Sequence, residues 1–259
     1  MISKRSCSAI AQYAAKNGLE NRVDRALAAL AAILPKLGSH SQSRSMVNRI
    51  GITLLQDTVQ IVAPSCPDYS HEQGKYTFHS VGSGLPLLSQ LHIAFLDTIV
   101  AHVPGVRCEI VVADQEADDA ALCQQTGLCR DEFLLKIQQS IATTQTHLQE
   151  KSWTVSAMTT RFPDLMCIEA ELTEEITNDR HLNRQITNDT LSRASMYQKI
   201  GVYDIDQMRR RTIRTASQYS ALAKIAARDK LLVCNHETVN LGWYNRYDAA
   251  VLHNPISVY

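Results

Sequence analysis

The sequence predicts an α/β fold: a Rossmann-like parallel sheet flanked by helices, in a three-layer sandwich. Short apolar runs rich in β-branched residues recur along the chain, and amphipathic helical segments separate them. The order strand, helix, strand, helix, strand is the pattern of a doubly wound α/β sheet. In such a sheet the loops after the strands lie on one edge, where ligands bind.

The composition is that of a globular protein without net charge. The 259 residues include 26 Lys and Arg and 26 Asp and Glu. The length fits one α/β domain, in which we expect residues 1–50 to form a helical cover and residues 55–259 to form the Rossmann-like core. The neutral total gives no global sign of a nucleic-acid partner, but it is compatible with a local basic patch. The oligomeric state is left open, with a monomer favoured.

Cysteine usage and hydropathy predict a cytoplasmic protein. The seven cysteines are scattered, without a CxxC motif. This pattern fits reduced thiols, and it favours neither a disulfide framework nor a metal site. No segment has the apolar length needed to cross a bilayer, and the N-terminus lacks the pattern of a secretory signal. We therefore expect no membrane association.

Apolar spacing predicts the elements in order. Residues 8–36 are expected to be helical with a break at Asn17-Gly18, and a polar link follows at 38–45. The first strand is expected at 58–63 (TVQIVA), with Pro64 ending it. The polar segment 169–190 is interpreted as a turn-rich excursion. Later strands are predicted at 107–113, 153–158, 231–235 and 249–259, and helices at 87–103, 131–150 and 205–229.

The loop after the first strand offers candidate nucleophiles and substrate-binding residues, Ser65, Cys66, Asp68 and Tyr69. A hydroxyl at the carboxyl end of a strand can face substrate, and it becomes a nucleophile once a base activates it. Cys66 is the alternative, because a thiolate is intrinsically the stronger nucleophile. The same residue types also fit an ordinary turn.

A glycine loop precedes the helix predicted at 87–103. Gly82, Ser83 and Gly84 would allow the backbone to approach a phosphate or ribose at the helix N-terminus. The loop matches neither GxGxxG nor the P-loop, and it faintly resembles the glycine loop of Rossmann methyltransferases. Asp114 closes the next strand, where those enzymes hold a ribose. An S-adenosylmethionine-dependent methyltransferase is therefore one alternative function.

Charged residues cluster in two further segments. Asp114, Glu116, Asp118 and Asp119 form an acidic loop, which fits a helix cap, a ribose or metal site, or a pocket for a cationic side chain. The helix at 205–229 is basic, which is typical of a solvated face and is also compatible with a surface that contacts a nucleic-acid backbone. Its candidate nucleic-acid contacts are Arg209, Arg210, Arg211 and Arg214.

A single carboxylate follows the strand predicted at 231–235. Glu237 is a candidate general base, or an ordinary polar loop residue.

Several segments resemble the cyclodipeptide synthases. QIVAPS is similar to that family's first strand, where an apolar run delivers a serine nucleophile, and Ser65 falls at the matching place. EIVVADQEADDAALCQQTG resembles the second strand and the short helix after it. Glu237 and Tyr259 resemble the family's catalytic Glu and a later pocket Tyr. SCPDY and KYTFHSVGSG are similar to the divergent, arginine-using branch.

The chain also departs from that family's pattern. A supporting tyrosine would stand at position 233, which is Val233, and Tyr219 or Tyr244 is the candidate replacement. The segment before Ser65 is Ala63-Pro64 rather than an apolar residue preceded by Gly. The helix at 131–150 lacks the basic face that the family turns toward tRNA, and the helix at 205–229 is the candidate replacement.

The resemblance implies an aminoacyl-tRNA-dependent aminoacyltransferase that makes a cyclic dipeptide without a cofactor. Ser65 would accept an aminoacyl group from one charged tRNA, a second aminoacyl-tRNA would donate its amine, and Glu237 would help to move protons. The implied partner is aminoacyl-tRNA. A non-catalytic Rossmann-like binding domain is the remaining alternative.

Overall fold

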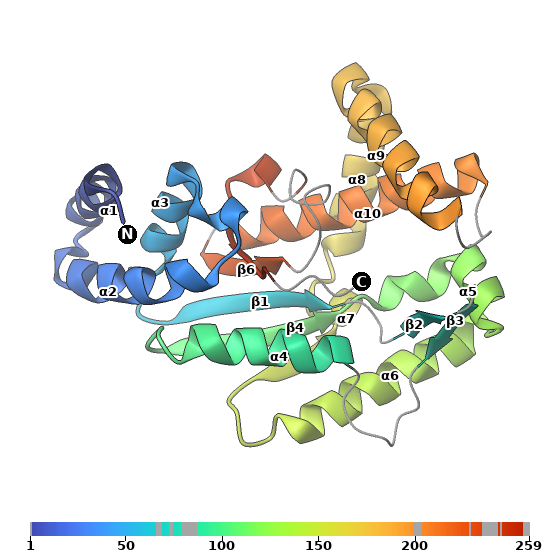
Figure 1. Cartoon of the computed structure of the whole chain (residues 1–259), viewed down its shortest axis with the longest axis horizontal. Helices are drawn as coiled ribbons and strands as arrows, with labels where there is room; N and C mark the ends of the chain where they lie inside the picture. Colours follow the sequence, from blue (N-terminus) through green and yellow to red (C-terminus); the bar gives the residue numbers. More distant parts are fainter. Residues whose placement is uncertain are drawn as a thin grey trace.

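A five-stranded, fully parallel sheet lies at the centre of the computed structural model, with helices on both of its faces (Figure 1). The structure describes residues 2–65, 69–72, 75–78, 87–198, 204–227, 229–234, 243 and 245–255. In spatial order the strands are β5 (Thr154–Ala157), β4 (Val106–Val112), β1 (Val59–Ser65), β6 (Lys230–Cys234) and β7 (Ala250–His253). A separate antiparallel pair is formed by β2 (Tyr69–Glu72) and β3 (Lys75–Phe78). The predicted α/β class is confirmed.

The chain builds the sheet outward from β1, first toward β4 and β5 and then toward β6 and β7. Because crossovers between parallel strands are right-handed, reversing the direction of growth places the connecting helices on opposite faces. Figure 1 shows α4 (Leu87–Val100) and α6 (Arg130–His147) below the sheet and α10 (Ile205–Ala226) above it. The direction reverses between β1 and β6, and ligands of such sheets bind at the carboxyl side of that point.

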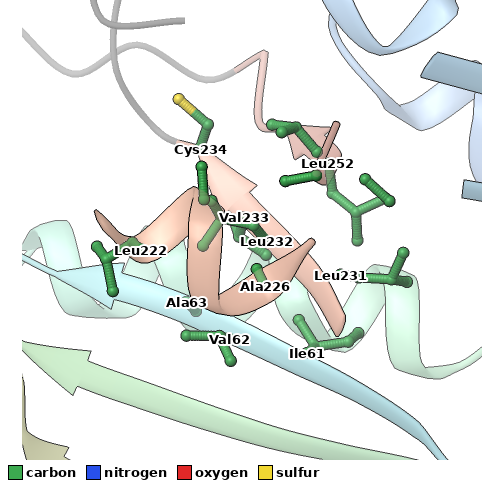
Figure 2. Close-up of a cluster of buried hydrophobic side chains, with 14 of the residues drawn as sticks. Ile61, Val62, Ala63, Leu222, Ala226, Leu231, Leu232, Val233, Cys234 and Leu252 are labelled. Atoms are coloured by element: carbon green, nitrogen blue, oxygen red, sulfur yellow. The ribbon is translucent and has the colours of Figure 1, made fainter. Parts of the chain in front are cut away.

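The middle strands are apolar because both of their faces are covered. Ile61, Val62 and Ala63 of β1 are buried, and Figure 2 shows them beside Leu231 of β6 and Leu222 of α10. Strands covered on both faces read as continuous apolar runs rather than alternating ones. This is why TVQIVA and LLVC could be recognised as strands.

Strand β1 continues through Pro64, so the prediction that this proline ends the strand is wrong. Pro64 and Ser65 remain in register with Val111 and Val112 of β4. Proline has no backbone N–H to donate to a neighbouring strand, so it is rare in central strands. On its other side β1 pairs with β6 only at residues 60–62, so the proline interrupts no ladder there.

Three helices lie in the N-terminal segment: α1 (Lys4–Asn17), α2 (Val23–Ile33) and α3 (Arg44–Thr53). The expected break lies at Gly18, whose left-handed backbone (φ 69°) ends α1. The link at 38–45 then closes the β7 edge, because the Gly38 N–H donates to the His253 carbonyl oxygen at 2.8 Å. The Ser41 hydroxyl donates to the Val251 carbonyl oxygen at 2.6 Å.

The segment 169–190 is not a turn-rich excursion, which corrects the sequence-based prediction. It lies in two helices, α8 (Leu165–Asn178) and α9 (Arg180–Gln198). Thr and Asn are weak helix formers, but tertiary packing overrides propensity here, because Leu172 and Ile186 are buried in the core. The Asp179 side chain accepts hydrogen bonds from the first backbone N–H groups of α9 and so starts that helix.

Helices between the strands complete the layers. In the part of the chain that the structure describes, the remaining ones are α5 (Ala120–Thr126), α7 (Met158–Arg161) and short 3₁₀ segments that include η3 (Ser39–Gln42) and η4 (Asp114–Asp118). The strand predicted at 153–158 and the helices predicted at 131–150 and 205–229 are confirmed within a few residues at each end.

Gly105 is expected to tolerate alanine worse than Gly127. Both have left-handed backbone, with φ of +67° and +69°, so alanine costs about 1–2 kcal/mol of unfolding free energy at either position. At Gly105 the added Cβ would also lie 2.7 Å from the Asp57 carbonyl oxygen, whereas nothing lies within 4 Å of it at Gly127. Urea unfolding of Gly105→Ala and Gly127→Ala measures the difference. Equal losses would contradict a close approach at Gly105.

Candidate functional site

The carboxyl edge of the sheet places Ser65 beside the point where strand growth reverses. Ser65 is the last residue of β1 and is half-buried. Its carbonyl oxygen accepts a hydrogen bond from the Ala113 N–H at 2.9 Å, which ties the end of β1 to the end of β4. Cys234 ends β6 on the other side and is buried. The backbone therefore holds the predicted nucleophile at the crevice position of an α/β sheet.

Much of the predicted site lies outside the described residues. For Tyr69 the structure gives its place at the start of β2. The predicted residues outside the described part are Cys66, Asp68, Gly82, Ser83, Gly84, Glu237, Tyr244 and Tyr259.

Asp114 holds two strand ends together. Its carboxylate accepts a hydrogen bond from the Thr159 backbone N–H at 3.0 Å and another from the Thr159 hydroxyl. The first of these bonds gives a partner to a backbone N–H in the first turn of α7. Together they join the end of β4 to the end of β5. Both carboxylate oxygens are thus engaged, which competes with the ribose-binding role that the methyltransferase alternative gives to Asp114.

The acidic loop is folded into a short helical segment and only partly exposed. Residues Asp114–Asp118 form the 3₁₀ segment η4, which buries Gln115 and Ala117 and leaves Glu116 half-buried. The Asp119 side chain accepts from the Leu122 N–H at 3.1 Å, so the helix-capping interpretation is confirmed at this residue. Among the described residues no group of three His, Cys, Asp or Glu side chains could hold a metal ion.

The basic helix is not a simple solvated face, which corrects one of the two sequence-based interpretations. Residues 216–223 of α10 are buried, Tyr219 among them, because α10 packs against α8 and α9 as well as against β6. The 22 residues of α10 span about 33 Å, whereas the seven of β1 span about 23 Å. The C-terminal end of α10 leads directly into the start of β6. Because α10 is longer than the strands, its N-terminal turns extend past the carboxyl edge of the sheet (Figure 1).

The four arginines of this extension have different partners. Arg209 donates to the Asn183 side-chain oxygen at 2.6 Å and to the Thr187 hydroxyl at 3.1 Å, so it fixes α9 onto α10. Arg214 donates to the Gln115 carbonyl oxygen and thereby reaches η4. Arg211 lies beside Asp119, and Arg210 is exposed.

The acidic loop and the basic helix form one cleft of about 360 Å³. It lies between η4 and α5 on one side and the first turns of α10 on the other. Its described lining residues are Asp118, Asp119, Ala120, Gln124, Gln207, Arg210, Arg211 and Arg214. Sequence reasoning found both charged segments but did not join them, since no local pattern connects residues about ninety positions apart.

The chain matches no protein-family model, no curated protein and no solved structure. Within the described residues, no helix combines the length and the apolar character that a membrane span requires. The function must therefore be argued from the carboxyl edge and the cleft themselves.

Glu169 of α8 is a buried carboxyl group behind the cleft. It is 9% exposed, and its Oε2 atom has no hydrogen-bond partner among the described residues. Burial raises the pKa of Glu169 to about 7, against the opposing attraction of Arg214, and the Asp118 carboxylate adds to the increase. The ion pair between Glu169 and Arg214 is long, at 3.9 Å.

Replacing Glu169 by glutamine is expected to stabilise the protein more at pH 8 than at pH 5. The pKa of Glu169 is raised from 4.5 in the reference state to about 7 in the fold. Its contribution to stability is therefore present at low pH and is lost as the pH rises through 7. Glutamine carries no charge, so the advantage of Glu169→Gln should grow by about 1–3 kcal/mol between pH 5 and pH 8.

Urea unfolding at the two pH values measures this advantage. Glu171→Gln, which removes an exposed carboxylate from the same helix, is the control. A Glu169→Gln advantage that does not change with pH would contradict the buried-carboxyl explanation.

Proposed function

We propose that this protein is an aminoacyl-tRNA-dependent aminoacyltransferase that forms a cyclic dipeptide through an acyl-enzyme at Ser65. The observation that carries the proposal is the position of Ser65, half-buried at the end of the middle strand and beside the reversal point of the sheet. A nucleophile there faces the crevice where α/β sheets bind ligands. The resemblance of QIVAPS to the first strand of the cyclodipeptide synthases supports the same residue.

In this proposal the Ser65 hydroxyl attacks the ester carbonyl of one aminoacyl-tRNA. A seryl ester forms, the bond to the tRNA ribose oxygen breaks, and that oxygen takes up the proton that the serine loses. The amine of a second aminoacyl-tRNA then attacks the seryl ester, which forms an amide and frees Ser65. Finally the remaining amine attacks the second tRNA ester, closes the ring and releases the second tRNA.

The proposed chemistry needs no external energy source, because each step converts an ester into another ester or into an amide. Glu237 is the proposed proton carrier, and Tyr259 the proposed pocket residue. Tyr219 is buried in α10, the helix that covers β1 and β6, and it remains a candidate supporting tyrosine together with Tyr244. The methyltransferase alternative is less favoured, because both carboxylate oxygens of Asp114 already accept hydrogen bonds from Thr159 that join two strand ends.

Replacing Ser65 by alanine should abolish cyclic dipeptide formation. We expect cells that express the wild-type chain to accumulate a new cyclic dipeptide, and Ser65→Ala to lower it at least about a thousandfold, because the acyl-enzyme cannot form. Mass spectrometry of cell extracts measures the product. It also identifies the amino acids that are joined.

Ser156→Ala is the matched control, since Ser156 is a half-buried serine near the carboxyl end of β5. It should keep the product at the wild-type level. No cyclic dipeptide from the wild-type chain, or undiminished product from Ser65→Ala, would overturn the proposal. The first outcome would favour a non-catalytic binding domain.

A further inference from the structure

Three arginines of α10 face the same cleft. Arg210 and Arg214 are four residues apart and Arg211 and Arg214 are three apart, so all three lie on one side of the helix. This side is turned toward η4 and α5. The side chains of Arg211 and Arg214 are only 14% and 27% exposed, so the wall of the cleft holds them in place.

The two aspartates of the cleft have stronger partners than these arginines. Asp118 accepts from Arg130 Nε at 2.6 Å, and Asp119 caps α5. The contacts of Asp118 with Arg214 and of Asp119 with Arg211 are both 3.9 Å, which is too long for a direct hydrogen bond. Such ion pairs are weak, so a better acceptor can replace them at little cost, while the hydrogen bond from Arg214 to the Gln115 carbonyl oxygen keeps Arg214 in place.

The balance of charge in the cleft is positive. Among the described residues, three arginines line it against two aspartates, and Arg130, which also pairs with Asp131, lies beside Asp118. Glu169 lies behind Arg214, but its raised pKa leaves it partly uncharged near neutral pH. Arg210 makes no ion pair with a described residue. The cleft is therefore suited to an anion that accepts several hydrogen bonds.

We propose that this cleft binds the phosphate group of a nucleotide, with Arg210, Arg211 and Arg214 as the donors. Guanidinium groups match the oxygen geometry of phosphate and bind it by charge-assisted hydrogen bonds. A volume of about 360 Å³ exceeds what a phosphate alone needs and lies in the range of small-ligand pockets. The amides of Gln124 and Gln207 can both donate to and accept from a base or ribose.

This binding site does not depend on acyl transfer at Ser65. The nucleotide is either a free mononucleotide or the terminal nucleotide of an RNA, since both present the same phosphate chemistry. The proposed site is narrower than the set of four arginines that the sequence suggests as nucleic-acid contacts. Arg209 is committed to α9, and the contact is confined to the three arginines of the cleft.

Calorimetric titration with AMP, adenosine and uncharged tRNA tests the proposal. We expect AMP to bind the wild-type chain at least tenfold more tightly than adenosine, which lacks the phosphate. Arg210→Ala should weaken AMP binding about 10- to 100-fold, because it removes a charge-assisted donor. Since Arg210 is exposed, this variant should fold normally, and Arg214→Lys, which keeps the charge but loses the guanidinium fork, is the second variant.

Arg184→Ala is the control, an exposed arginine of α9 that does not line the cleft, and it should bind like the wild type. A second outcome is that AMP does not bind but tRNA does. If only the cleft variants then weaken tRNA binding, the nucleotide belongs to an RNA. If AMP and tRNA binding are both unaffected by Arg210→Ala and Arg214→Lys, the proposal is overturned. Ser65→Ala should bind AMP normally, so loss of cyclic dipeptide and loss of nucleotide binding are separable results.

Discussion

The burial of β1 between its two neighbouring strands and under α10 is the constraint on which the other features depend. Ile61, Val62 and Ala63 are almost completely buried, and Leu222 of α10 and Leu231 of β6 pack beside them (Figure 2). Apolar burial of this extent stabilises a fold by about 1.5–3 kcal/mol for each large side chain. It fixes the register of β1, and therefore the place of Ser65 at the carboxyl edge.

Helix α10 has two roles along its length. Its C-terminal half is buried and packs beside the sheet, with Ala221, Leu222 and Ala223 in the core. Its N-terminal half extends past the sheet edge and carries the arginines that line the cleft. Because both halves belong to one rigid helix, the packing on the sheet also sets the position of the arginines relative to η4. The cleft is thus a consequence of the core.

The cleft has a cost in stability. Glu169 is buried, and its Oε2 atom has no hydrogen-bond partner among the described residues. Arg214 lies 3.9 Å from its Oε1 atom, too far to compensate fully for the lost hydration. A fold optimised for stability alone would place an apolar or amide side chain there. Such local conflicts are expected at functional sites, which gives independent support to the assignment of a binding role to this region.

The sequence by itself determined the central strands and the helices α1, α2, α4, α6 and α10. Apolar runs such as TVQIVA and helical spacing such as that of α10 are local patterns, set by the period of side chains along one element. It also placed Ser65 directly after the first strand, in a loop at the carboxyl edge of the sheet. Only the tertiary structure decided that Pro64 stays within β1, that the segment 169–190 is helical, and that Arg214 reaches Gln115, ninety-nine residues earlier. These outcomes depend on which neighbour each element packs against. The packing energy comes from contacts between residues far apart in the sequence, so no local pattern reveals it.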